Sequence, residues 1–335
     1  MPLDASPTPF AIEVDGLTVR FRKRGEPEVC AVNGVSFALA RGQVLTILGE
    51  SGSGKSVSLK AVMGLLPGFA QVGGGVRMAG RDILTLPPRE LAKLRGGEVS
   101  MIFQEPMAAM DPVYTIGDQI AETIVQHEGT SHATAMARAK VLLERVSIPS
   151  AARRLRNYPH EMSGGMRQRA MIALALACKP SVLLADEPTT ALDVTVQIQI
   201  LMLLRDLQAE LGMAVVFVTH DVGVAAEISD RIAVMYAGRF VETGTVREVI
   251  RSPQHPYTQG LLASTVHGGM RNQVLRTIPG HPPSLAILPI GCHFRPRCPE
   301  AVSRCTEEPP VVEAHPGRLV RCVHAEAAAD APVPA

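Results

Sequence analysis

One stretch of the chain has the residue types and the spacing needed to bind a nucleoside phosphate. Residues 49–56 read Gly-Glu-Ser-Gly-Ser-Gly-Lys-Ser and fit the pattern G-x-x-x-x-G-K-[ST] at every fixed position. Glycines let successive backbone N–H groups point at one anion, and a following helix N-terminus adds partial positive charge. Lys55 can reach the β- and γ-phosphates, and the Ser56 hydroxyl can ligate Mg²⁺. The stretch therefore predicts a site for a nucleoside triphosphate and Mg²⁺.

The sequence on both sides of this stretch has the form that a phosphate-binding loop requires. Residues 44–48 are apolar and rich in β-branched side chains, which is typical of a buried parallel strand. Residues 57–63 read as the first turns of a helix. The alternative, a glycine-rich turn that binds nothing, explains neither the match at every fixed position nor the two flanks.

An aromatic residue stands at the end of an earlier predicted strand. Phe21 either stacks on an adenine ring or is an ordinary strand aromatic, and the sequence leaves both interpretations open. The complete set of predicted nucleotide contacts is Phe21, Gly49, Glu50, Ser51, Gly52, Ser53, Gly54, Lys55, Ser56 and Val57.

Two carboxylates follow the apolar run of residues 181–185. Asp186 can hold Mg²⁺ through water, and Glu187 is placed to polarise an attacking water. An Asp-Glu pair at a strand end is usually a helix cap. Downstream of a complete phosphate loop, however, one acid for the metal and one for the water suit the hydrolysis of a phosphoanhydride.

Two further polar residues stand at strand ends. Gln104 ends the short predicted strand 99–104, and His220 follows the strand 214–218. Polar groups at the carboxyl ends of strands in an α/β sheet lie near the ligand crevice. Taken singly, the glutamine would be a loop residue and the histidine a structural one. Their positions relative to the phosphate loop favour a place near the ligand crevice for Gln104 and a contact with the γ-phosphate for His220.

A second anion-binding element is predicted at Ser163, Gly164 and Gly165, which open a helix starting at Met166. These residues cannot serve the same phosphate from the same side as the phosphate loop, whereas a second chain facing the first would bring the two elements together. Asp193 is the expected N-cap of the next long helix.

Composition and charge narrow the class of protein. The chain has 335 residues, of which 46% are apolar, enough for a large core. Lys and Arg total 33 and Asp and Glu 32, so no basic footprint points to nucleic acid as a partner. The N-terminus lacks the pattern of a secretory signal, and no apolar run reaches about 18 residues. We therefore expect a cytosolic chain that does not itself span a membrane.

Four of the six cysteines crowd into the last 44 residues: Cys292, Cys298, Cys305 and Cys322. In a cytosolic protein such a cluster favours a metal over disulfides. The spacing is not the paired C-x2-C of zinc ribbons, and four thiolates suit either zinc or an iron–sulfur cluster. Reduced thiols without a metal are the alternative. The cluster predicts a small metal-stapled C-terminal lobe.

In this order the motifs resemble those of an ABC-type ATPase over residues 12–250. The signature departs from the usual Leu-Ser-Gly-Gly-Gln, since Met162 and Met166 stand at its ends, and Val57 stands where many relatives have Thr. The three central residues of the signature are intact, and Val57 lies beyond the Mg²⁺ ligand Ser56, so we do not expect it to impair binding. The resemblance implies that residues 49–56 are the Walker A loop, residues 182–187 the Walker B strand and Gln104 the Q-loop residue. It implies that the signature consists of Ser163, Gly164, Gly165 and Met166, that Asp193 belongs to the D-loop and that His220 is the switch histidine. Mg²⁺ would be held by Ser56, Gln104 and Asp186.

A narrower resemblance, to the ATPase subunits of oligopeptide/dipeptide and nickel importers, rests on several segments. They are residues 103–107, 163–169 and 185–195, and in the tail 255–258, 278–283 and 291–299. This resemblance implies that the four cysteines hold a [4Fe–4S] cluster, with zinc as the runner-up.

The same resemblance implies a function. The chain would hydrolyse ATP to drive peptide import, as one of two ATPases, the other a paralogue, beneath two permeases supplied by an extracytoplasmic binding protein. It would lie peripherally on the cytoplasmic face of the bacterial inner membrane. Nickel or another small solute is the alternative cargo. A soluble, non-transport ABC ATPase is less favoured, because such proteins usually carry two cassettes or a long coiled coil.

The predicted fold is α/β, with a mixed sheet core, an antiparallel β subdomain, a helical insertion and a small Cys-rich C-terminal lobe. Along the chain, we predict a disordered segment at residues 1–10 and then the ABC ATPase domain at 11–250, with its helical subdomain at 105–178. The C-terminal region follows at 251–325, and a disordered tail at 326–335.

Overall fold

The computed structural model describes residues 10–190, 192–264 and 277–325. The two terminal segments predicted to be disordered lie outside these ranges, except that Phe10 begins strand β1 (Phe10–Phe21). The chain divides into two compact units: one comprises mainly residues 77–218, and the other 13–37, 44–76 and 219 onwards. The predicted domain boundaries at 250 and 325 remain predictions.

The first unit contains parallel strands in the order β8-β7-β6. Strands β6 (Val99–Ile102) and β7 (Val182–Asp186) pair in parallel, and β7 pairs in the same way with β8 (Ala214–Thr219). Every residue of these three strands is buried, as expected for strands covered on both faces. Their carboxyl ends are therefore aligned on one edge, where Gln104 and Glu187 follow.

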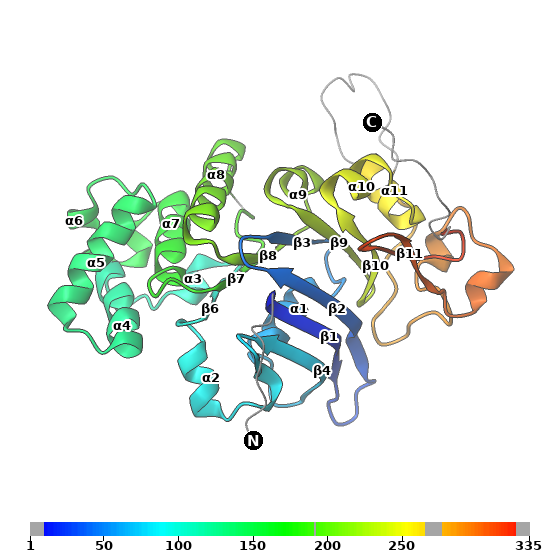
Figure 1. The fold of residues 1–335 in the computed structure, drawn as a ribbon, viewed down its shortest axis with the longest axis horizontal. Coiled ribbons are helices and arrows are strands. Elements are labelled where there is room, and N and C mark those ends of the chain that lie inside the picture. Colours follow the sequence, from blue (N-terminus) through cyan, green and yellow to red (C-terminus); the bar gives the residue numbers. More distant parts are fainter. Residues whose placement is uncertain (1–9, 191, 265–276, 326–335) are drawn as a thin grey trace. The chain divides into compact units, whose positions relative to one another are not determined.

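Helices fill the chain between β6 and β7, as the predicted helical insertion requires (Figure 1). Serine, threonine and aspartate begin several of them by accepting a hydrogen bond from an N–H of the first turn, which satisfies a donor that has no partner within the helix. The helices of this unit are α2 (Pro88–Leu94), α3 (Pro106–Ala109), α4 (Ile116–Glu128), α5 (His132–Arg145), α6 (Ala151–Arg154), α7 (Gly164–Ala175) and α8 (Val194–Leu211).

The second unit contains a mixed sheet in the order β11-β12-β10-β9-β3. Strand β3 (Val44–Leu48) pairs in parallel with β9 (Arg231–Tyr236), and β9 pairs antiparallel with β10 (Arg239–Thr245). The predicted mixed sheet is confirmed. The remaining strands are β12 (Arg318–Arg321) and β11 (Val311–His315), an antiparallel hairpin joined to β10.

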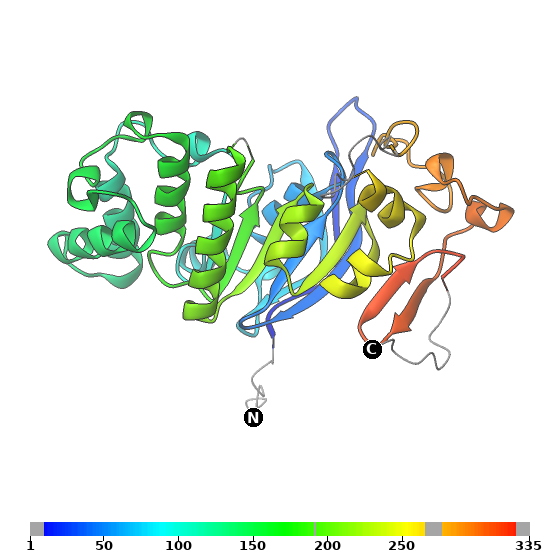
Figure 2. The ribbon, with the colours of Figure 1, turned by 90° about the horizontal axis from the view of Figure 1, so that it is seen from above.

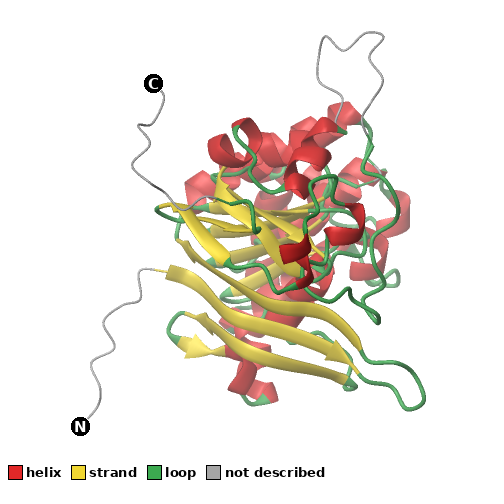
Figure 3. Cartoon of the chain, turned by 90° about the vertical axis from the view of Figure 1, so that its right-hand side faces the viewer, coloured by secondary structure: helices red, strands yellow, loops and turns green. Residues whose placement is uncertain are grey.

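A second sheet has the order β2-β1-β4-β5, with long neighbouring strands visible in Figure 3. Its members are β1, β2 (Val29–Ala40), β4 (Ala70–Met78) and the short β5 (Arg81–Asp82). The helices of the second unit are α1 (Lys55–Val62), α9 (Val222–Ile228), α10 (Val246–Arg251) and α11 (Pro256–Ala263).

The structure does not support the predicted separate Cys-rich lobe. Strand β12 pairs with β10, and the Phe294 ring meets Tyr236 of β9 and Tyr257 of α11 with centroids 5.2 and 5.4 Å apart. Cys292 and Cys298 pack against the same apolar cluster as α10 and α11, whose ribbons appear in yellow in Figure 2. This C-terminal segment therefore shares a core with the sheet, because its aromatic and apolar side chains find partners there without a metal staple.

A buried histidine in this core makes stability depend on pH. His255 begins α11, and its Nδ1 accepts a hydrogen bond from the Tyr257 N–H at 3.0 Å. Burial lowers the pKa of His255 from the usual 6.5 to about 3. Between these pH values the unfolded chain takes up a proton that the folded chain does not. The free energy of unfolding should therefore fall by up to about 1.4 kcal/mol per pH unit as the pH drops below about 6.5.

Urea unfolding at several pH values checks this expectation. His255→Asn keeps an acceptor at the helix start but has no titrating ring, so its unfolding free energy should fall less steeply below about pH 6.5 than that of the wild type. The exposed His281, changed to Asn, is the control and should leave the slope unchanged. An equal slope for the wild type and His255→Asn would contradict the assignment.

Candidate functional site

The phosphate loop runs from the end of β3 to the start of α1, as predicted. Lys55 is buried, and its Nζ donates to the carbonyl oxygens of Gly49 at 2.8 Å and Glu50 at 2.9 Å. These bonds curl the backbone of residues 49–55 around the lysine. The loop is thereby held in the compact form in which successive N–H groups can face one anion.

Two glycines of this loop are required by close backbone approaches. A Cβ on Gly49 would lie 2.3 Å from the carbonyl oxygen of Met235, and one on Gly54 would lie 2.3 Å from that of Ala31. Gly54 also has φ of 105°, a conformation that other residues rarely adopt. The spacing of glycines in the motif therefore has a packing reason as well as a ligand-binding one.

The two carboxylates sit where β7 ends. Asp186 is the buried last residue of the strand, and Glu187 follows with φ of 45°, which is strained for a residue with a side chain. The Glu187 N–H donates to the carbonyl oxygen of Val218 at 3.0 Å, which ties this turn to β8. Such strain concentrates at functional sites, because a regular conformation would aim the side chain elsewhere.

The side chain of Glu187 is oriented by two neighbours. The Thr190 hydroxyl donates to its Oε2 at 2.9 Å, and the Gln104 Nε2 lies 3.5 Å from the same oxygen. The structure thus brings together two residues that the sequence placed at the ends of separate strands. Sequence reasoning missed Thr190, although its position three residues after Glu187 is that of a side chain able to reach back across a turn.

The predicted second anion-binding element starts α7. Ser163 is the N-cap, and its hydroxyl oxygen accepts from the Met166 N–H at 3.4 Å. Ser163 and Gly164 are exposed, whereas a Cβ on Gly165 would lie 2.9 Å from Cγ1 of Val196 in α8. Asp193 caps α8 by accepting from the Val196 N–H at 3.0 Å, which confirms the predicted cap.

The last strand-end residue, His220, is exposed directly after β8. The next residue, Asp221, begins α9 by accepting hydrogen bonds from the N–H groups of Gly223 and Val224 at 2.7 and 3.2 Å. The cap fixes the backbone at the start of α9, and His220 lies directly before this fixed residue.

Comparison with known proteins agrees with this geometry. The ABC transporter family matches residues 32–190, and the oligopeptide/dipeptide transporter C-terminal region matches residues 241–305. The chain is 48% identical to the oligopeptide transport ATP-binding protein OppD of Salmonella typhimurium over 94% of each chain. It is 44% identical to the corresponding protein AppD of Bacillus subtilis over 93% of this chain and 95% of that one. The chain belongs to the oligopeptide/dipeptide branch of the ABC transporter ATP-binding proteins.

Solved structures of ABC cassettes share its fold. A dimeric post-hydrolysis state of the ATP-binding cassette MJ0796, bound to ADP and Pi, has a TM-score of 0.63 at 29% identity and covers 70% of this chain and 99% of its own. The cassette cbiO1 from Clostridium perfringens, part of the transporter complex cbiONQ, has a TM-score of 0.62 at 26% identity, with coverages of 72% and 91%. The fold of this ABC protein is thus that of an ATP-binding cassette.

Phe21 of this ABC protein lines an open pocket in the second unit. Its ring centroid lies 5.9 Å from that of Phe69, and the Lys23 ammonium lies 5.2 Å from the centre of the Phe69 ring. Lys23 and Phe69 are candidates that sequence reasoning missed. Phe69 is distant from Phe21 in the sequence, and only folding brings the two rings together.

The four C-terminal cysteines do not form a metal site in the structure. Within the described ranges, no group of three or more His, Cys, Asp or Glu side chains is arranged to hold a metal ion. All six cysteines of the chain are free, and burial raises the pKa of Cys292, Cys298 and Cys322, that of Cys298 to about 11. The predicted [4Fe–4S] cluster and its zinc alternative are not supported.

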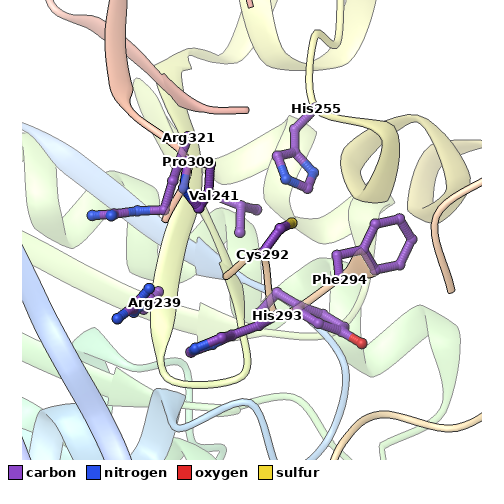
Figure 4. A pocket seen from close by; sticks show the side chains of 9 residues that line it. Arg239, Val241, His255, Cys292, His293, Phe294, Pro309 and Arg321 are labelled. Atoms are coloured by element: carbon purple, nitrogen blue, oxygen red, sulfur yellow. The ribbon is translucent and has the colours of Figure 1, made fainter. Parts of the chain in front are cut away.

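Charged as well as apolar side chains surround Cys292. It lies in a small pocket together with His255, Phe294 and the two cationic residues Arg239 and Arg321 (Figure 4). Arg239 and Arg321 both pair with the Glu308 carboxylate, at 2.6 and 2.9 Å, so two positive charges share one negative charge.

Proposed function

We propose that this chain is the ATP-hydrolysing subunit of an ABC importer for peptides. The observation that carries the proposal is similarity over nearly the whole length to oligopeptide transport ATP-binding proteins, including the C-terminal region matched at residues 241–305. That region lies outside the segment matched by the general ABC transporter family, residues 32–190, and it is what favours peptides over other solutes.

The residues of the ATP site have distinct roles in the proposal. Lys55 and the loop N–H groups bind the β- and γ-phosphates, and Ser56 and Gln104 ligate Mg²⁺, with Asp186 binding it through water. Glu187 takes the proton of the attacking water, and His220 contacts the γ-phosphate. Mg²⁺ would neutralise charge that develops on the phosphates. The 3.5 Å approach of Gln104 to Glu187 supports a link between metal and water positions.

A second ATPase chain completes the site in the proposal. Exposed Ser163 and Gly164 at the start of α7, with Gly165 and Met166, would bind the partner's γ-phosphate, and Asp193 would contact the partner. The dimeric ADP-bound state of MJ0796 supports a two-chain arrangement. We propose a paralogue as the partner. The two ATPases would lie on the cytoplasmic face of the bacterial inner membrane, beneath two permeases that receive the solute from an extracytoplasmic binding protein.

The membrane role is consistent with the helices. In the described part of the chain, none is both long and apolar enough to cross a bilayer. Translocation would then take place through the permeases.

Reconstitution of the chain with its permeases and binding protein in vesicles tests the proposal. Uptake of a labelled tri- to hexapeptide mixture should require internal ATP and should stop when Glu187 is changed to Gln. Uptake of nickel instead of peptides would favour the alternative cargo. ATP hydrolysis that no permease or solute stimulates would point to a soluble ABC ATPase.

Phe21 is proposed to stack on adenine. Phe21→Ala should raise KM for ATP about 5- to 12-fold, since stacking on an aromatic ring contributes about 1–1.5 kcal/mol, and kcat should change little. Phe37→Ala, an aromatic change on β2, is the control. An unchanged KM for Phe21→Ala would leave the residue as an ordinary strand aromatic.

The iron–sulfur prediction now rests on sequence alone. Cys292, Cys298, Cys305 and Cys322 would be its ligands, and ligation would require the local structure to rearrange and the thiols to lose their protons. Iron, sulfide and zinc analysis of anaerobically purified protein is the measurement. Stoichiometric iron and sulfide with visible absorbance that Cys298→Ser removes would establish the cluster, and their absence would exclude it from the purified protein.

A further inference from the structure

The phosphate loop contains an acidic residue that a binding site for a polyanion must neutralise. Glu50 is the second residue of the loop, and its side chain is 29% exposed. A carboxylate so close to the bound phosphates repels them unless a cation balances it, because the effective dielectric at such a site is far below that of water. The proposed residue roles give the side chain of Glu50 no function.

The balancing cation comes from the C-terminal region, 247 residues further along the chain. Arg297 donates from Nη1 to Oε2 of Glu50 at 2.8 Å and from Nη2 to Oε1 at 3.1 Å. This two-point geometry fixes the orientation of the carboxylate and places a cation against it. The Arg297 side chain is 5% exposed, so water screens the pair weakly on the arginine side.

Arg297 is itself held in place from several directions. Its Nε donates to the carbonyl oxygen of Pro279 at 2.9 Å, and the guanidinium carbon lies 5.8 Å from the Tyr236 ring centre and 6.0 Å from that of Phe294. Burial opposes the positive charge, but hydrogen bonds to Glu50 and Tyr236 outweigh it and keep the pKa of Arg297 above its usual value. Arg297 is therefore positively charged and held in a fixed orientation beside the phosphate loop.

The backbone of Glu50 is anchored by the same region. Its N–H donates to the Tyr257 hydroxyl at 3.0 Å, and Tyr257 is fully buried. Its carbonyl oxygen accepts from the Lys55 Nζ at 2.9 Å. Side chain, N–H and carbonyl of one loop residue are thus each bonded, and two of the three partners come from the C-terminal region.

We propose that Arg297 is a positioning residue of the ATP site, which neutralises Glu50 and locks the phosphate loop, so that the C-terminal region supports nucleotide binding directly. This inference rests on the proposed ATP-binding function. It assigns the C-terminal region a task within the nucleotide site, in addition to any role in selecting the importer type.

A double-mutant cycle tests the charge-balancing role. Binding of a fluorescent ATP analogue with Mg²⁺ is measured on the full chain, for the wild type, Arg297→Met, Glu50→Gln and the double variant. Arg297→Met should weaken binding about tenfold by leaving Glu50 unbalanced, and Glu50→Gln should change it about twofold or less. The double variant should recover to within about threefold of the wild type, because the repelling charge is gone.

Further variants separate this role from a purely structural one. Arg297→Lys should bind with intermediate affinity, since it keeps the charge but loses the two-point geometry. Arg295→Met, the same change two residues away, should bind like the wild type. In steady-state hydrolysis Arg297→Met should raise KM for ATP more than it lowers kcat.

The outcomes are distinct. A double variant as weak as Arg297→Met would show that the arginine serves only the fold, and wild-type binding by Arg297→Met would overturn the inference. Failure of the wild type itself to bind the analogue would instead contradict the proposed ATPase function.

Discussion

Steady-state ATP hydrolysis should fall at least about 100-fold when Glu187 is replaced by glutamine, while ATP binding is retained. The amide has nearly the shape of the carboxylate and can still accept the hydrogen bond from the Thr190 hydroxyl, which lies at 2.9 Å in the wild type. It cannot accept the proton of the attacking water. The variant should therefore bind ATP, form the closed dimer with the proposed partner chain and remain in that ATP-bound state.

Two measurements check this expectation. Phosphate release gives the rate, and size-exclusion chromatography with ATP and Mg²⁺ shows whether the variant accumulates as an ATP-bound dimer. Glu90→Gln, a partly exposed carboxylate on α2 in the same unit, is the control and should hydrolyse ATP at the wild-type rate. Retention of more than about a tenth of the activity by Glu187→Gln would remove it from the role of general base.

The second large effect is expected on stability, at a buried ion pair between β10 and β12. Glu242 is fully buried and Arg318 is 4% exposed, and Nη2 of the arginine lies 2.8 Å from Oε1 of the glutamate. The carboxylate also accepts from the N–H groups of Gln254 and His255, both at 3.0 Å. Arg318→Met would leave a buried negative charge without its cation, and should lower the free energy of unfolding by about 3–5 kcal/mol.

Urea unfolding of the variant measures this loss. Arg20→Met removes an arginine whose side chain is 48% exposed and paired with Glu28, and should cost less than about 1 kcal/mol. Combining Arg318→Met with Glu242→Leu removes both charges and should be less destabilising than the sum of the single changes. A loss below about 1 kcal/mol for Arg318→Met would mean that water or rearrangement reaches the pair.

Local patterns made the catalytic cassette predictable. The phosphate loop needs its glycines, Lys55 and Ser56 within one short stretch, so the motif is complete in the sequence. The strand-end residues Gln104 and Glu187 could be placed because parallel strands align their carboxyl ends on one edge. The structure adds the 3.5 Å approach between them.

The C-terminal region was predictable only in part. Cysteine spacing suggested a separate metal-stapled lobe, whereas Phe294 packs against Tyr236 and Tyr257 and strand β12 joins β10. Spacing records how many cysteines lie close along the chain. It does not show which apolar side chains from other parts of the chain pack against this segment. That packing places the segment in the core of the sheet instead of in a separate lobe.

By itself, then, the sequence determined that this chain has a nucleotide-binding loop, two carboxylates suited to hydrolysis and the order of motifs of an ABC ATPase, because each depends on residues close together in the chain. Only the tertiary structure decided which residues from distant parts of the chain contact these motifs. The contact of Arg297 with Glu50 spans 247 positions and that of Tyr257 with the same residue spans 207. Such pairs leave no local pattern, since their energies depend on distances that only the folded core sets.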